Sequence, residues 1–529
     1  MSKISKMMTP PSKASVLTEP TDEGAKLVKP MLVFFGLVCL LFTVCFNQLN
    51  TVNAIPIMIV GLAVVVGLFI FMKITGKMSV ENFIILLFVA GIIIRLGYVL
   101  YTPLTESSRV RQHDVYAFGS GKGHSGYIEH FYENGFKLAD FNPTTVSQFY
   151  HPPLHHFLAA LWMRVLTLFG MSYERAITSL QFLALFYSCC CMLVSERIFR
   201  VFNLKGAGLC TALAVVVFHP TMILLSGSIN NDQLALLFTL LAVYTTVKWY
   251  NDSTTKNILL VALSIGLGMM TKLSVALVAP PVAIVFLIKL IQANKKKTVD
   301  YIGQYCVFGV VCIPLGMWFA IRNFIKYQVP LTYVAKLSDT SDQYLGNYSV
   351  SERLFGFSNH PFENVFLNRI ATGADFYEYN PFVAILKSSI FGEYKFSDTN
   401  DAITPFCRIL LILNFVVIAV SLCAMIYMLI KKKSIIDKNM KIFIAAFYLL
   451  LFGNFINFCF KYPHNCSMDF RYIVPTMIIG AMFIGMLVQY AYENKKDVKL
   501  KLTYFTALGS SAVFSAFSII VYIMLGIKT

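Results

Sequence analysis

Long uninterrupted apolar segments constrain what this chain can fold into more than any other feature. Segments such as 55–72, 83–100 and 409–430 are about as long as a helix needs to cross the hydrocarbon core of a bilayer. A chain inside a bilayer must satisfy its backbone hydrogen bonds internally, which leaves only helices and closed barrels. Continuous apolar runs without alternation favour helices. We therefore predict an all-α polytopic membrane protein.

Basic residues are concentrated in short clusters between these segments, and they give the chain a formal net charge of +17. Clusters of this kind are typical of cytoplasmic loops of membrane proteins. Their placement therefore argues against a nucleic-acid partner. The clusters are Lys73/Lys77, Arg197/Arg200/Lys205, Lys295/Lys296/Lys297, Lys431/Lys432/Lys433 and Lys495/Lys496/Lys499/Lys501.

The segment 152–170 decides the topology. If it crossed the membrane, every later basic cluster would lie outside, against the charge bias of cytoplasmic loops. It opens with Pro152-Pro153 and carries Arg164 near its middle, and an arginine at the centre of an inserted helix costs about 2.5–3.5 kcal/mol. We therefore predict an external juxtamembrane helix and about 13 transmembrane helices, at 31–47, 54–72, 81–101, 174–199, 206–227, 231–250, 256–271, 274–291, 300–322, 405–430, 438–460, 469–491 and 502–525.

This topology divides the chain into five parts and places the C-terminus outside. Both large polar segments are then external, so we expect an integral protein of the plasma membrane with its active site on the non-cytoplasmic face. The parts are a disordered cytoplasmic tail (1–30), an extra transmembrane hairpin (31–80), a catalytic transmembrane module (81–322) with a first external loop (102–173), a large external loop (323–404) and C-terminal helices (405–529).

Asp114 is the leading candidate for a catalytic residue. It follows the span 81–101 in the stretch Arg111-Gln112-His113-Asp114-Val115-Tyr116. Only 13% of the residues are charged, so a carboxylate beside the membrane is a candidate functional group. A carboxylate there can act as a general base for chemistry on a substrate carried by a lipid.

Further ionisable residues fall at the same outer ends of the predicted spans, where such groups are functional candidates. Each also has an ordinary interpretation, because an arginine or lysine at a helix end can be an interfacial anchor and an aspartate can be a helix cap. A carboxylate surrounded by cations suits transfer of a group from a lipid phosphate, since cations stabilise the phosphate as it leaves. These residues are Arg95, Asp232, Lys272, Arg322 and Arg471.

A metal site has weaker support. His151 and His155 are four residues apart, a spacing that can provide half of a metal site on a helix. Two prolines separate them, and the sequence shows no third ligand. We therefore expect no metal and no cofactor, with a divalent metal as the less favoured alternative.

The order of these motifs resembles that of the GT-C membrane glycosyltransferases of family 39, which include protein O-mannosyltransferases and lipid A aminoarabinose transferases. The resemblance covers about 81–491. It rests on the first-loop aspartate, Tyr150-His151-Pro152-Pro153-Leu154, Asn231-Asp232, Thr271-Lys272-Leu273-Ser274, Trp318 followed by Arg322-Asn323, and Phe470-Arg471-Tyr472 followed by Pro475.

The resemblance implies a GT-C fold and an inverting transferase that moves a sugar, mannose or another hexose, from a polyprenyl phosphate to an external acceptor (protein, glycan or lipid). It implies that Asp114 is the catalytic base and that His151 lies near the donor phosphate. Asp232 matches a second acidic position at the edge of the site. Arg322 and Arg471 match phosphate or acceptor contacts, and His113, Lys272 and Arg95 are further candidates for substrate binding.

The sequence also departs from the family. Val115 follows Asp114 where many relatives have a second acid, which argues against a metal site built from that pair of carboxylates. Two competing functions stay open. A transporter or lipid flippase would have charges spread through the membrane midplane and broken helices in paired halves, whereas the charges here collect at one face. A non-catalytic scaffold would not need Asp114.

Overall fold

The computed structural model describes residues 22–45, 54–104, 112–357, 365, 378–393, 403–432 and 434–528. In these residues the regular structure is helical, apart from one isolated β-bridge between Tyr344 and His464. Ten of the described helices are long and apolar enough to cross a membrane, or eleven if one bent pair counts as a span. The predicted fold class, an all-α polytopic membrane protein, is confirmed. The count of 13 spans and the domain boundaries remain predictions, and residues 1–21 of the predicted tail lie outside the described residues.

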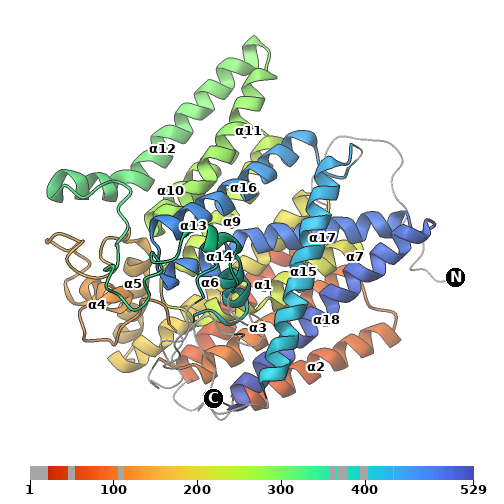
Figure 1. The fold of residues 1–529 in the computed structure, drawn as a ribbon, viewed down its shortest axis with the longest axis horizontal. Helices are drawn as coiled ribbons and strands as arrows, with labels where there is room; N and C mark the ends of the chain where they lie inside the picture. Colours follow the sequence, from red (N-terminus) through yellow and green to blue (C-terminus); the bar gives the residue numbers. More distant parts are fainter. Residues whose placement is uncertain are drawn as a thin grey trace.

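The long helices form one bundle, in which some of the shorter helices also take part (Figure 1). The long helices are α1 (Asp22–Cys45), α2 (Ala54–Ile74), α3 (Val80–Tyr101), α6 (Tyr173–Val201), α9 (Asp232–Asn251), α10 (Thr255–Thr271), α12 (Lys295–Tyr327), α15 (Thr404–Ile430), α16 (Lys438–Lys461), α17 (Val474–Glu493) and α18 (Val498–Lys528). The shorter ones are α4 (Gly123–Glu133), α5 (Leu154–Leu168), α7 (Gly206–Phe218), α8 (Pro220–Leu224), α11 (Ala279–Ile291), α13 (Val350–Phe355) and α14 (Pro381–Phe391).

The core of the bundle is formed by α3, α6 and α17. In their most apolar segments 78%, 78% and 83% of the residues are buried, against 22% in α1 and 11% in α2. The N-terminal hairpin therefore lies at the periphery, with most of its apolar surface left for lipid.

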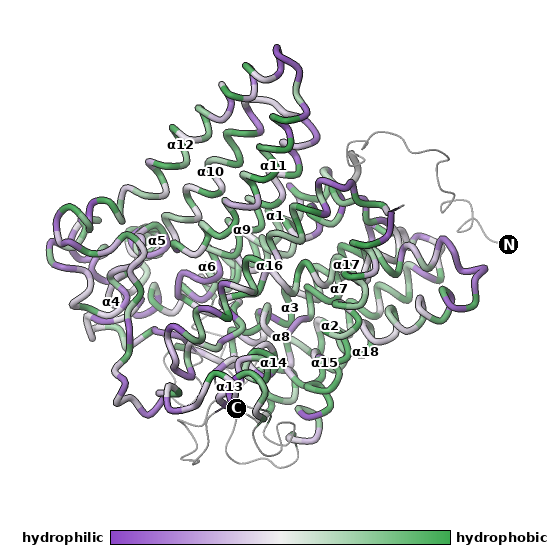
Figure 2. The backbone as a smooth tube through the Cα atoms, turned by 45° about the horizontal axis from the view of Figure 1, so that its top comes forward, coloured by the Kyte–Doolittle hydropathy of each residue, from purple (hydrophilic) through white to green (hydrophobic). Residues whose placement is uncertain are grey.

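Basic loops meet at one end of the bundle. In the loop after α6, the Asn203 side chain donates to the Ile435 carbonyl (3.3 Å), and the Lys205 backbone N–H donates to Gln489 Oε1 (2.8 Å). At the same end, the Tyr250 hydroxyl donates to Asp437 (3.0 Å). Figure 2 shows hydrophobic colour along the helices and hydrophilic colour at loops such as the one between α11 and α12. This arrangement fits the charge pattern from which the topology was predicted.

Helix α5 lies along the opposite rim. It has 15 residues, fewer than a helix needs to span a bilayer, and it packs on α4 and α6. Arg164 donates to the Tyr132 carbonyl of α4, and its guanidinium lies 4.1 Å from the centre of the Tyr132 ring. Arg164 is thus paired with the neighbouring short helix, which fits the predicted juxtamembrane position.

Several predicted spans differ from the structure. The first span, predicted at 31–47, begins at Asp22, so residues 22–30 of the predicted disordered tail are helical. The span 206–227 is broken into α7 and a second segment inclined by 53°, because Pro220 lacks the N–H that would continue the helix. The span 300–322 is longer, since α12 runs from Lys295 to Tyr327. The span 469–491 begins only at Val474, because two 3₁₀ turns (Asn465–Met468 and Phe470–Tyr472) precede it and Pro475 takes an early helical position.

Candidate functional site

Arg471 lies at the centre of a cluster of charged side chains at the rim opposite the basic loops. One terminal nitrogen, Nη2, is 3.2 Å from Asp114 Oδ2, and the other, Nη1, is 3.2 Å from Asp232 Oδ2. Longer ion pairs connect Arg471 to Glu393 (3.7 Å) and Asp469 (3.9 Å). Asp114 and Asp232 therefore share one rim, as the predicted topology requires.

Backbone contacts fix the loop that carries Asp114. The Gln112 side chain donates to the Gly227 carbonyl (2.7 Å) and accepts from the Ile229 N–H (2.9 Å), which ties the loop to the segment before α9. The carbonyl of Asp114 accepts from the His124 N–H of α4 (3.0 Å). Asp114 adopts a φ of +56°, a left-handed conformation that aspartate and asparagine tolerate better than most residues. Its side chain stays 43% exposed.

Gly123 allows this close approach between the loop and α4. Its φ is +70°, and a Cβ atom placed on it would lie 2.3 Å from Cδ2 of Tyr116 and 2.7 Å from the Asp114 carbonyl oxygen. No side chain fits there.

Asp232 is the first residue of α9, where the helix dipole favours a negative charge. Its carboxylate accepts from the Asn230 side chain (3.1 Å) and pairs with Lys272 Nζ. Asn231 in turn donates to the Thr271 carbonyl (3.1 Å), which fixes the end of α10 beside α9. The Asn-Asn-Asp triplet thus sets the position of both Asp232 and Lys272.

A cavity of about 240 Å³ opens beside this cluster. Its polar end is lined by Asp114, His151, Asp232, Lys272 and Arg471. The remaining wall is mostly apolar and comes from α9, the turn before α11, and α16, with Leu236, Val275, Phe447, Leu451 and Phe455. Such a cavity suits a molecule with a charged head and a lipid tail.

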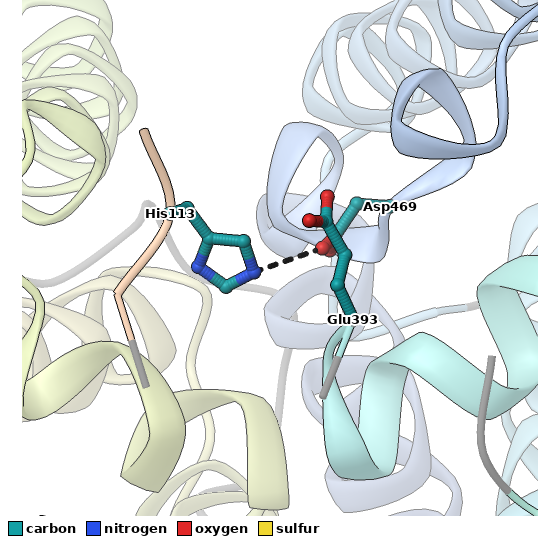
Figure 3. Close-up of side chains that lie close together, drawn as sticks. All are labelled: His113, Glu393 and Asp469. Carbon is teal, nitrogen blue, oxygen red and sulfur yellow. Dashed lines mark ion pairs between the residues drawn. The ribbon is translucent and has the colours of Figure 1, made fainter. Parts of the chain in front are cut away.

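Behind Arg471, His113, Glu393 and Asp469 converge from three distant parts of the chain (Figure 3). His113 Nε2 is 3.2 Å from Asp469 Oδ2. Burial raises the pKa of Glu393 to about 7. Burial alone would raise the pKa of Asp469, but the adjacent His113 ring lowers it. Burial also opposes a charge on His113, yet the two carboxylates raise its pKa.

Histidines line the side of the cavity formed by α4 and α5. His124 Nδ1 and His156 Nε2 are 2.8 Å apart, and the His151 ring stacks on that of His124 with centroids 5.4 Å apart. Burial lowers the pKa of His151 to about 3. His151 is therefore neutral at pH 7, and it can donate a hydrogen bond to a phosphate without adding charge.

Two predicted site residues lie elsewhere. Arg322 donates to the Ala139 carbonyl (2.9 Å) and to Asn323 Oδ1 (2.8 Å), and it does not line the cavity. Arg95 is fully buried in α3, where it donates to the Val217 carbonyl (2.7 Å) next to the break after α7. A helix break leaves carbonyls without their usual partners, so Arg95 supports this bend.

Glu393 and Asp469 belong to the cluster, although neither was predicted as a site residue. Asp469 had one signal, its position two residues before Arg471. Glu393 had only its position just after the apolar helix α14, and nothing local connects it to Asp114.

Residues 150–318 match the model of the dolichyl-phosphate-mannose-protein mannosyltransferase family. The predicted resemblance is confirmed for this part of the chain. No curated protein matches the chain significantly.

Two solved structures are distantly similar. The oligosaccharyltransferase of Archaeoglobus fulgidus is 12% identical with a TM-score of 0.47, over 84% of this chain and 55% of that one. The chain thus spans about half the length of that relative. ArnT from Cupriavidus metallidurans is 13% identical with a TM-score of 0.39, over 85% of this chain and 78% of that one. ArnT has also been solved with undecaprenyl phosphate bound.

Proposed function

We propose that the chain is an inverting glycosyltransferase that moves a sugar from a polyprenyl phosphate to an external acceptor. The observation that carries the proposal is the position of Arg471, which joins Asp114 to Asp232 at the polar end of a largely apolar cavity. The family match over residues 150–318 supports the same class of donor and favours mannose or another hexose as the sugar.

The donor fits the cavity with its lipid tail against the apolar wall and its phosphate at the polar end. Lys272 and Arg471 face this end, and each is paired with a carboxylate in the structure. A bound phosphate becomes an additional partner for both cations. They then stabilise the negative charge that develops on the phosphate as it leaves, while neutral His151 supplies a hydrogen bond.

Asp114 acts on the acceptor. Its carboxylate takes the proton from the acceptor group as the acceptor atom attacks C1 of the sugar from the face opposite the phosphate. The bond between C1 and the phosphate oxygen breaks, and its electron pair leaves with the polyprenyl phosphate. A new bond to C1 forms with inverted configuration. The transfer consumes no cofactor. The exposure of Asp114 leaves room for an acceptor, which is a protein, a glycan or a lipid on the non-cytoplasmic face of the plasma membrane.

The test is the Asp114→Asn variant of the full chain. Asparagine tolerates the left-handed backbone at this position, so the change removes the charge and leaves the loop in place. We expect turnover to fall by about 10²–10⁴-fold, the usual contribution of a general base, with the protein folded and the donor lipid still bound. Mass spectrometry of the lipids that co-purify with this variant identifies the sugar.

Two results contradict the proposal. Full turnover by Asp114→Asn on the true substrates would exclude this residue as the base. Lipid flipping by the protein in vesicles, with no covalent transfer to any acceptor, would instead favour a flippase.

A further inference from the structure

We infer that His113, Glu393 and Asp469 form a binding site for one divalent transition-metal cation next to the proposed catalytic loop. One ligand atom from each side chain, a ring nitrogen or a carboxylate oxygen, lies within 4.8 Å of the other two. The three side chains point toward one another (Figure 3). They come from the first external loop, from the residues just after α14 and from the turn before α17.

The spacing fits a shared ion. His113 Nε2 and Asp469 Oδ2 are 3.2 Å apart. Two ligands bound to one metal ion at about 2.1 Å each are about 3.0–3.4 Å apart when they occupy adjacent positions. The Glu393 oxygen lies within 4.8 Å of both.

The ligand atoms of this proposed site are largely buried, so water does not readily satisfy them. His113 is 7% exposed and Asp469 is 2% exposed. Within the described residues, Asp469 Oδ2 and Glu393 Oε1 are buried without a well-formed hydrogen bond and have only ion-pair contacts. Buried carboxylate oxygens are normally satisfied by hydrogen bonds or by a metal.

The charge balance points the same way. Four carboxylates (Asp114, Asp232, Glu393 and Asp469) face two permanent cations, Lys272 and Arg471. With the four carboxylates ionised, these six side chains carry a formal charge of −2, which one divalent cation would offset.

Arg471 does not occupy this site. Its short ion pairs, at 3.2 Å, go to Asp114 and Asp232. Its distances to Glu393 (3.7 Å) and Asp469 (3.9 Å) are longer. The oxygens that would bind the cation, Glu393 Oε1 and Asp469 Oδ2, therefore have no short contact with Arg471.

One imidazole and two carboxylates suit Mn²⁺ or Zn²⁺. A bound ion would hold the three segments together and, through His113, fix the loop that carries Asp114. Cation binding requires neither the sugar donor nor the acceptor substrate. A test of cation binding can therefore succeed or fail independently of the proposed sugar transfer.

The test is a Mn²⁺ titration of the purified full chain, first stripped with a chelator, with free Mn²⁺ measured by electron paramagnetic resonance. We expect about one Mn²⁺ per chain, displaced by Zn²⁺, and a higher unfolding temperature with bound metal. Glu393→Gln and Asp469→Asn should each weaken binding at least tenfold. The matched control is Asp140→Asn, which removes an exposed carboxylate paired with Lys326 and should leave binding unchanged.

Glu393→Gln alters the more exposed of the two carboxylates, so it provides the test of the site if Asp469→Asn does not fold. Folded wild-type protein that binds neither Mn²⁺ nor Zn²⁺ would overturn the inference. Wild-type affinity in folded Glu393→Gln would also overturn it.

Discussion

Arg471 lies 3.2 Å from Asp114, although 357 residues separate them in the chain. This contact joins the loop between α3 and α4 to the turn before α17. The side chain of Arg471 is 5% exposed, whereas that of Asp114 is 43% exposed. The proposed base thus faces the acceptor side while its counter-ion is buried, and the guanidinium can hold the carboxylate in place without blocking it.

Arg471→Lys should lower turnover by about 10²-fold, the usual cost of removing a donor that stabilises a developing anion. A lysine ammonium lacks the planar fork with which Arg471 reaches Asp114 and Asp232 at once. Arg471→Ala should in addition destabilise the fold by about 3–5 kcal/mol, because it leaves buried carboxylates without their partner. Turnover and chemical unfolding in detergent measure the two effects. Wild-type turnover in Arg471→Lys would contradict the bridging role.

Arg322→Lys is the matched comparison, and we expect its turnover to stay within about threefold of the wild type. Arg322 binds the Ala139 carbonyl and Asn323, outside the cavity. Loss of these exposed or part-buried hydrogen bonds should cost about 0.5–1.5 kcal/mol of stability. Donor binding and unfolding of the same preparation separate the two effects. A large rise in KM for the donor with unchanged stability would restore Arg322 to the substrate site.

The helical bundle was predictable from the sequence, because the length of each apolar segment and the basic residues beside it can be read without knowing the tertiary structure. The helix ends were less so. Pro220 breaks a span that looks continuous by hydropathy, and the polar turns before Val474 delay α17 although apolar residues precede it. Both deviations lie beside the charged cluster, where irregular backbone brings polar side chains to the rim of the bundle.

The candidate site was predictable in part. The predicted topology alone brought Asp114, Asp232, Lys272 and Arg471 to one rim, since each was expected at an outer helix end. It could not distinguish Arg322, which lies at the same level but on a peripheral helix. Nor could it place Glu393, because the sequence around this residue has no periodic pattern.

Arg95→Gln should lower the unfolding temperature with little effect on turnover per folded molecule. Arg95 donates to the Val217 carbonyl and to Ser188 Oγ (3.1 Å) inside the bundle. A shorter amide cannot reach both acceptors, and each buried polar group left unpaired costs about 1–3 kcal/mol. Thermal unfolding and turnover are measured on the same folded fraction. Normal stability combined with lost donor binding would instead assign Arg95 to the substrate site.

His155→Gln should reduce the loss of stability of the protein in acid. Burial lowers the pKa of His155 from 6.5 to about 4 in the folded chain. Between these values the unfolded chain binds a proton that the folded chain does not, so stability falls as the pH falls, by at most about 1.4 kcal/mol per pH unit. Glutamine cannot titrate, and its amide can still donate to the Ile229 carbonyl that His155 contacts at 2.7 Å. The free energy of unfolding, measured from pH 7 to pH 4, should therefore fall less steeply in the variant. Parallel curves for variant and wild type would show that the pKa of His155 is the same in the folded and the unfolded chain.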